Sequence, residues 1–199
     1  MPNTQHKMAL GARQIPNPIV ITAPQEKEVI EVIRNRCKEV KAKLYEVNKD
    51  IFYEKTNDGF NVTGIFGEYP CLKTNLLGKH QLINATVAIG IVEALQLYNI
   101  HVGIDSIRDG LYRTVWPGRC EVVSCNPLTV LDGAQNIASI RALKETIKEN
   151  FSASGKYKRL LLVLGISNDK DIKGICQELY DLADKIILTK ADNPRATKP

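Results

Sequence analysis

Residues 128–147 read LTVLDGAQNIASIRALKETI, in which a short apolar run ends at Asp132-Gly133 and a helical pattern follows. This spacing of apolar residues predicts a helix over 134–150 with one face turned toward a core. A strand that passes directly into a helix is the repeating unit of α/β proteins, so this stretch decides the fold class. The inward positions of the predicted helix are Ile137, Ile140, Leu143 and Ile147.

Strand and helix signals recur on both sides of this stretch. We expect strands at CEVVS (120–124), RLLLVLG (159–165) and KIILT (185–189), and a helix over 172–183. The alternation predicts an open, Rossmann-like α/β sheet with crossover helices, in which the fully apolar run at 159–165 is a central parallel strand. The chain stops soon after the last strand, so we expect this domain to be truncated at its end.

The first half of the chain begins with a strand–helix–strand unit, continues with a small antiparallel excursion and ends with two helices. Asn57-Asp58-Gly59 lies between short alternating runs and is a hairpin signal. Asp105 is the expected cap of the last helix. The predicted segments are strands at 19–22 and 44–47 and helices over 25–43, 78–98 and 104–115.

Trp116-Pro117-Gly118-Arg119 separates the two halves, because adjacent proline and glycine interrupt regular structure. We therefore predict one domain over 1–116 and a second over 117–199. Arg119 is held in this stiff turn, where its guanidinium could pair with a phosphate. The alternative is a surface arginine packed over Trp116.

The composition is that of a soluble globular protein, with 44% hydrophobic and 25% charged residues. Basic and acidic residues are interspersed and the net charge is only +5, which argues against a nucleic-acid surface. We find no run that is apolar enough to span a bilayer and no apolar signal core at the N-terminus, so we expect a cytoplasmic protein without a membrane partner. The five cysteines form no CxxC pair, and we interpret them as reduced structural thiols.

Polar residues follow three predicted strands, at Asp132-Gly133, 165–171 and 189–195. Ligands of open parallel sheets bind beyond the carboxyl ends of the strands, so these segments would share one edge if the sheet is parallel. Asp132 could accept hydrogen bonds from a ribose, and the helix N-terminus at 134–136 could face an anion. The alternative is that Asp132 only caps the helix.

His80 and Asn84 share one face at the start of the helix over 78–98. A lone histidine there is more often a core or capping residue than a ligand. The sequence has no GxxxxGK[ST] motif, so a phosphate-cradling loop is absent from it.

The chain contains, in this order, ITAPQ, LLGKHQLINATVAIGIVEAL, DGLYRTVWPGRCEVV, VLDGAQN, VLGISNDKDI and ILTKADNPRA. Together these segments resemble the folylpolyglutamate synthase/dihydrofolate synthase family of the Mur-type ATP-dependent ligases. The resemblance extends from about Pro18 onward, and its HQxxNA, WPGR and LDGAxN motifs are specific in combination. It implies the last part of a P-loop-type central domain followed by a Rossmann-like α/β C-terminal domain.

The family joins glutamate to a folate or dihydropteroate carboxylate by way of an acyl phosphate made from ATP. The resemblance implies ATP contacts from Asn84, Arg119 and Asp132 and a role near the phosphates for Gln135. It also implies Mg²⁺, with ligands mostly in an N-terminal region of the family that this sequence does not contain. The expected partners are ATP, glutamate, the folate or dihydropteroate substrate and that N-terminal region; otherwise we expect a monomer.

The sequence departs from the family pattern at several points. Gln135 stands where the family has histidine, and glutamine cannot carry a positive charge. A carbamylated lysine is expected near the start, where Lys7 is the nearest candidate but lies out of register. We expect this chain to be inactive by itself. Two alternatives remain: another Mur-type ligase, acting on a cell-wall or cyanophycin precursor, and a non-catalytic remnant that binds a nucleotide or a partner.

Overall fold

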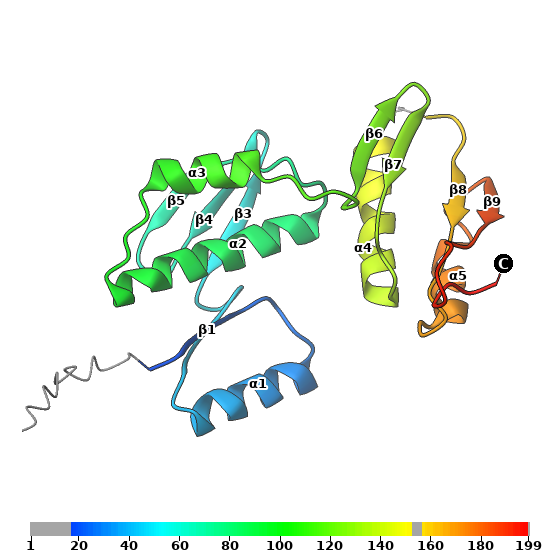
Figure 1. Cartoon of the computed structure of the whole chain (residues 1–199). Coiled ribbons are helices and arrows are strands. Elements are labelled where there is room, and N and C mark those ends of the chain that lie inside the picture. Colours follow the sequence, from blue (N-terminus) through cyan, green and yellow to red (C-terminus); the bar gives the residue numbers. More distant parts are fainter. Residues whose placement is uncertain (1–16, 153–156, 199) are drawn as a thin grey trace, which may run out of the picture.

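The computed structural model describes residues 17–152 and 157–198. Its elements form two groups, one before residue 114 and one after residue 120, joined by the segment that contains the WPGR turn (Figure 1). Helix α3 (Ile104–Arg113) ends before this turn and strand β6 (Glu121–Cys125) begins after it. The domain boundary after residue 116 stays a prediction.

The first group opens with the predicted strand–helix–strand unit. Strand β1 (Ile19–Thr22) pairs in parallel with β2 (Lys43–Glu46), and helix α1 (Lys27–Glu39) connects them. The helix is shorter than predicted, because Val40 is its C-cap and Lys41 takes a left-handed φ of 54°.

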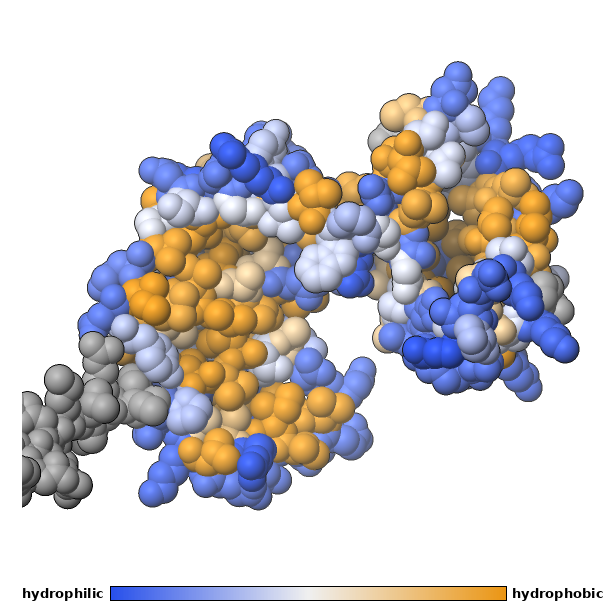
Figure 2. Space-filling model, in the orientation of Figure 1, coloured by the Kyte–Doolittle hydropathy of each residue, from blue (hydrophilic) through white to orange (hydrophobic). Residues whose placement is uncertain are grey.

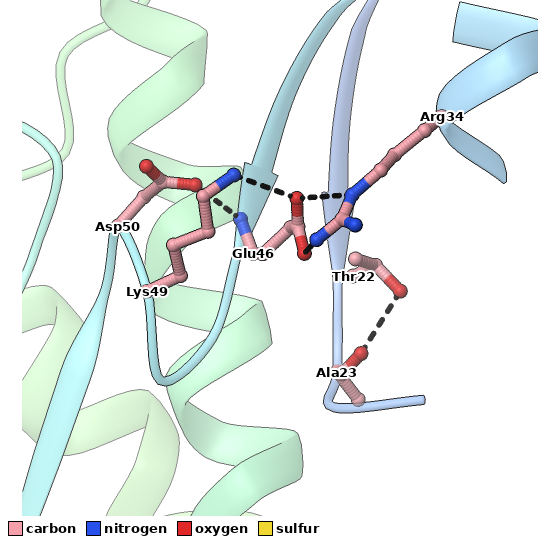
Figure 3. Close-up of polar contacts among 6 residues, drawn as sticks. All are labelled: Thr22, Ala23, Arg34, Glu46, Lys49 and Asp50. Carbon is pink, nitrogen blue, oxygen red and sulfur yellow. Dashed lines mark hydrogen bonds and ion pairs between the residues drawn. The ribbon is translucent and has the colours of Figure 1, made fainter. Parts of the chain in front are cut away.

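An ion-pair cluster ties α1 to the end of β2 (Figure 3). Arg34 donates two hydrogen bonds to the Glu46 carboxylate, at 2.6 and 3.0 Å, and Lys49 donates a third at 3.0 Å. Asp50 accepts from the backbone amide of Glu46 at 2.9 Å. The Arg34 guanidinium holds the pKa of Glu46 below its usual value, although burial opposes this.

An antiparallel sheet follows, in the order β3 (Phe52–Thr56), β4 (Gly59–Thr63), β5 (Glu68–Leu72). This confirms the hairpin that was predicted at Asn57-Asp58-Gly59. Helices α2 (Lys79–Ala94) and α3 pack on the sheet, and a short 3₁₀ turn (Leu95–Tyr98) extends α2. The core between sheet and helices includes Ile51, Phe60, Leu72 and Ile89. Asp105 is not the cap of α3: Gly103 occupies that position, and Asp105 pairs with Arg108 at 3.4 Å.

Helix α2 also carries a buried carboxylate. Glu93 is fully buried and accepts hydrogen bonds from the backbone amides of Ile65, Phe66 and Gly67 at 2.6–3.0 Å. It thereby holds the loop between β4 and β5 against the helix. The segment Lys79–Tyr98 is, by length and composition alone, apolar enough to cross a membrane, which differs from the expectation that no run of the sequence is. Its buried Glu93 and its packing against β1 and β3 are features of a core helix.

The second group contains the predicted strands and helices but not the predicted sheet. β6 pairs with β7 (Leu128–Leu131) in an antiparallel hairpin, and β8 (Leu161–Leu164) pairs in parallel with β9 (Lys185–Leu188). Within the described residues no ladder joins these two pairs. The expectation of one continuous parallel sheet is therefore wrong here, because the two residues between β6 and β7 leave room only for a hairpin.

Helix α4 (Ile137–Ile147), extended by a π-helical turn (Lys148–Ser152), packs against α5 (Ile172–Leu179). Ile140, Ile175 and Leu179 form the core between them. β8 is not a central strand, since Leu161 and Val163 are 57% and 60% exposed. Figure 2 shows apolar surface over this pair of strands. The whole is a mixed α/β structure in which α2 of the first group contacts α4 of the second.

Candidate functional site

A small pocket lies where the start of α2 meets the second group, with a volume of about 40 Å³. It is lined from three directions by His80 of α2, by Arg119, Cys120, Asp132 and Ala134 around the β6–β7 hairpin, and by Ser139, Leu143 and Thr146 of α4. The structure thus brings Arg119 and Asp132, predicted from separate segments, together beside His80.

The two groups meet closely at the edge of this pocket. Gly78 has a φ of 107°, and a Cβ atom there would lie 2.4 Å from the Oγ1 of Thr146 in α4. Only glycine therefore allows α2 to begin at this distance from α4. Position 78 fixes how near His80 comes to the side chains of the second group.

Asp132 holds the loops of the pocket together. Its Oδ2 accepts a hydrogen bond from the Cys120 amide and its Oδ1 accepts one from the Ala134 amide, both at 2.7 Å. Asp132 does not cap a helix, so that alternative is wrong. Each carboxylate oxygen has a second lone pair, so Asp132 remains able to accept a hydrogen bond from a ligand hydroxyl.

The helix after this loop begins later than predicted. Asn136 is the N-cap of α4, and its side chain and that of Ser139 bond reciprocally to each other's backbone amides at 2.8 and 3.1 Å. The amides of residues 134–136 therefore precede the helix. The Ala134 amide is already engaged by Asp132, so it is not available to an anion.

Arg119 sits in the turn that the sequence predicted. Its amide bonds to the Trp116 carbonyl at 3.1 Å, and the φ of Gly118 is 69°. No carboxylate of the described residues lies within ion-pair distance of its guanidinium, which leaves the charge available to a ligand.

Two titratable groups line the pocket beside Arg119. Burial lowers the pKa of His80, and the Arg119 charge lowers it further, while Asp132 and Glu145 act in the opposite direction. The imidazole is therefore neutral at pH 7. Burial and the Asp132 charge raise the pKa of Cys120 to about 11, so this thiol stays protonated and unreactive.

A chain of side-chain hydrogen bonds leads from the pocket to Asn84. The amide nitrogen of Gln81 lies 3.0 Å from the Nε2 of His80, and its oxygen accepts from Asn84 at 3.0 Å. In this arrangement the neutral His80 ring accepts at Nε2. Gln81 is 4% exposed, whereas Asn84 is exposed. The sequence points to Gln81 only as part of the HQxxNA motif and gives it no role of its own.

Other predicted groups lie outside the pocket. Gln135 is half-buried in the loop before α4 and does not line it, so its role stays a prediction. The loops after β8 and β9 bond to each other: Asp169 pairs with Arg195 and Lys170 at 3.0 Å, which holds its pKa at about 2. Asp169 and Arg195 thus pair with each other, and neither lines the pocket that contains Asp132. Lys7 lies outside the described residues.

The described residues do not fit a resident metal. No group of three or more His, Cys, Asp or Glu side chains among them could hold a metal ion. The pocket offers a single carboxylate, that of Asp132, among its lining residues. Mg²⁺ needs several oxygen ligands, so we assign no metal to these side chains.

Comparison with known proteins adds independent evidence. Residues 118–199 match the Mur ligase, glutamate ligase domain. The dihydrofolate synthase/folylpolyglutamate synthase of Bacillus subtilis is 31% identical over 184 residues, which are 89% of this chain and 42% of that protein. The Mycobacterium tuberculosis protein of the same name is 32% identical over 135 residues, 67% of this chain and 27% of its own. The chain therefore spans less than half the length of these relatives.

Comparison with solved structures shows the same similarity. The folylpolyglutamate synthase of M. tuberculosis complexed with ADP superimposes with a TM-score of 0.81 at 27% identity, over 92% of this chain and 41% of that one. Escherichia coli FolC in complex with DHPP and ADP gives 0.74 at 26% identity, over 89% of this chain and 41% of that one. Residues 118–199 are therefore a Mur ligase, glutamate ligase domain, and the chain as a whole is similar in sequence and fold to the folylpolyglutamate synthases/dihydrofolate synthases.

Proposed function

We propose that the chain contributes the Asn84, Arg119 and Asp132 side of the ATP site in a ligase that joins glutamate to a folate or dihydropteroate carboxylate. The single observation that carries this is the approach of Arg119 and Asp132 to His80 at the junction of the two groups. A cavity of about 40 Å³ is far smaller than the roughly 300–1,000 Å³ of a complete small-molecule site. It therefore suits one part of a nucleotide and not the whole.

The reaction makes physical sense for such a site. A carboxylate is a poor electrophile, so its oxygen first takes the terminal phosphoryl group of ATP and ADP leaves. The glutamate amine then attacks the acyl carbon and inorganic phosphate departs. Both steps move negative charge between oxygens, which an enzyme accelerates mainly by positioning and by charge neutralisation.

Each proposed side chain has a role that its chemistry permits. The guanidinium of Arg119 would neutralise phosphate charge, and the carboxylate of Asp132 would accept from a ribose hydroxyl. The amide of Asn84 would bond to the nucleotide while Gln81 orients it. Gln135 would donate a neutral hydrogen bond near the phosphates. Mg²⁺ would neutralise the phosphates through ligands other than these side chains.

The remaining expectations are part of the same proposal. All five cysteines are free, which suits the reducing cytoplasm. Glutamate and a folate or dihydropteroate would be the other ligands, and the chain would act as a monomer without nucleic acid. We expect no ADP release from this chain alone, because its pocket holds only part of a nucleotide.

The test is calorimetric titration of ADP into the chain and into Arg119→Ala. We expect weak binding that Arg119→Ala weakens by about tenfold, the loss of one charge-assisted contact. Arg113→Ala is the matched control, because Arg113 is exposed and pairs with Asp109 on the surface of α3, away from the pocket. Equal affinity in both variants would overturn the nucleotide assignment, and strong folate- and glutamate-dependent ADP release would overturn the expected inactivity.

A further inference from the structure

A second, larger cavity of about 310 Å³ lies near the first pocket, beyond Gly78. Its walls come from the end of the β3–β4–β5 sheet that carries the hairpin turn, from the segment that leads into α2, and from the π-helical turn after α4. Both groups thus contribute to it. None of the residues assigned to the nucleotide lines it.

Three lysines bring positive charge to this cavity. Lys55 lies in β3, Lys73 follows β5, and Lys79 is the first residue of α2. None of the three forms an ion pair with a described residue. Asp58 and Glu149 also line the cavity but lie beyond ion-pair distance of these ammonium groups. Among the residues that the structure describes, no carboxylate neutralises these three ammonium groups.

The N-terminus of α2 adds to this field. Gly78 and Lys79 line the cavity at the start of this 16-residue helix. No side chain caps the helix, and its first turn contains no acidic residue. The free amides and the positive end of the helix dipole therefore favour an anion at the same place as the lysines.

The walls also include apolar side chains. Phe60 is almost fully buried beneath the cavity, and Leu76, Leu77 and Leu82 are half-buried around it. A phosphate or sulfate ion has no apolar part that could pack against these side chains. A ligand with several carboxylates separated by methylene groups would use both the lysines and the leucines.

We propose that this cavity, built by Lys55, Lys73 and Lys79 around an apolar floor, binds the γ-linked oligoglutamate chain of the ligase's own substrate or product. The inference rests on the proposed function, since adding glutamate to a folate creates such a chain. Each γ-glutamyl unit contributes one free carboxylate and two methylenes. The cavity would hold a chain already added, while the reacting end lies on the far side of Gly78.

The test is calorimetric titration of γ-linked triglutamate into the chain at low salt. We expect binding that the double variant Lys55→Ala/Lys73→Ala weakens by about tenfold or more, and that falls steeply with added salt. Lys27→Ala/Lys38→Ala removes two exposed lysines of α1 and is the matched control, with an expected change of less than about twofold.

Inorganic phosphate and free glutamate are titrated in parallel. Triglutamate binding that exceeds both supports the proposal. The proposal is overturned if phosphate binds as tightly as triglutamate or more tightly, or if triglutamate does not bind. It is also overturned if both double variants lose triglutamate binding equally. ADP binding that depends on Arg119 should survive Lys55→Ala/Lys73→Ala. Failure of this proposal with ADP binding intact is thus distinct from failure of the proposed function.

Discussion

The carboxylate of Asp132 lies 2.7 Å from the backbone nitrogen of Cys120 and ties the loop after β7 to the turn before β6. The same carboxylate receives the Ala134 amide, and the Gly133 amide bonds to the Gly118 carbonyl at 2.9 Å. Arg119 lies between these bonded residues. Asp132 therefore lines the pocket that we propose for the nucleotide and also holds the turn that carries Arg119.

Arg119→Ala should raise the pKa of His80. The folded chain binds this proton less readily than the unfolded chain, because burial and the Arg119 charge both lower the pKa. The free energy of unfolding should consequently decrease as pH falls below about 6.5, and less so in Arg119→Ala. NMR titration of the imidazole measures the pKa directly. A His80 pKa that is the same in the unchanged chain and in Arg119→Ala would show that the Arg119 charge does not act on this imidazole.

Glu93→Gln should lower the free energy of unfolding by about 1–3 kcal/mol, because one amide oxygen cannot serve three buried donors. The amides of Ile65, Phe66 and Gly67 all point to the native carboxylate. Urea unfolding measures the change. Glu68→Gln removes an exposed carboxylate at the start of β5 and should have almost no effect. Equal stability of the two variants would contradict the role of Glu93.

The sequence predicted the local elements well and their assembly less well. Helical spacing at Ile140 and Leu143 identified α4, and the Asn136 and Ser139 capping pair could have located its start. The two residues between Cys125 and Leu128 could likewise have indicated a hairpin. Both signals are local, but the alternation of strands and helices favoured an earlier helix start and a parallel arrangement of the strands.

Other features depend on contacts that no local pattern contains. Gln81 reads as one polar residue on an apolar helix, and only the fold buries it between His80 and Asn84. The bond from Asp132 to Cys120 and the approach of His80 to Arg119 join segments that are distant in sequence. The ATP contacts of Arg119 and Asp132 are implied by the family resemblance. The spacing of residues alone does not distinguish a ligand-binding Asp132 from one that caps a helix.

Arg34→Ala should reduce the acid dependence of stability. Arg34 keeps the pKa of Glu46 in the folded chain below its value in the unfolded chain, which is about 4.3. The ion pair therefore stabilises the fold at pH values above about 4.3. This stabilisation is lost as the pH falls through the lower pKa of the folded chain. Thermal unfolding should show a fall in Tm of about 1–3 °C at pH 7 and a smaller difference at about pH 3. Arg36→Ala, which breaks an exposed pair with Glu39, is the control. A difference that grows at low pH would refute the assignment.

Gln135→His should strengthen the binding of phosphate-bearing ligands only at acidic pH. An imidazole at this half-buried position would be charged below about pH 6.5 and mostly neutral at pH 8. ADP titrations at about pH 5.5 and pH 8 should show a gain of several-fold at the lower pH alone. Gln177→His places the same side chain on the exposed part of α5 and controls for net charge. A gain of the same size in both variants would mean that position 135 does not face the phosphates.

The most direct measurement is titration of ATP–Mg²⁺ into the chain, into Asp132→Ala and into Asp171→Ala. Asp171 accepts a hydrogen bond from a backbone amide at the start of α5, as Asp132 does in its loop, but Asp171 does not line the pocket. We predict weak binding that is lost in Asp132→Ala and retained in Asp171→Ala. Binding that is absent from the unchanged chain, or unaffected by Asp132→Ala, would contradict the central claim that this junction is part of an ATP site.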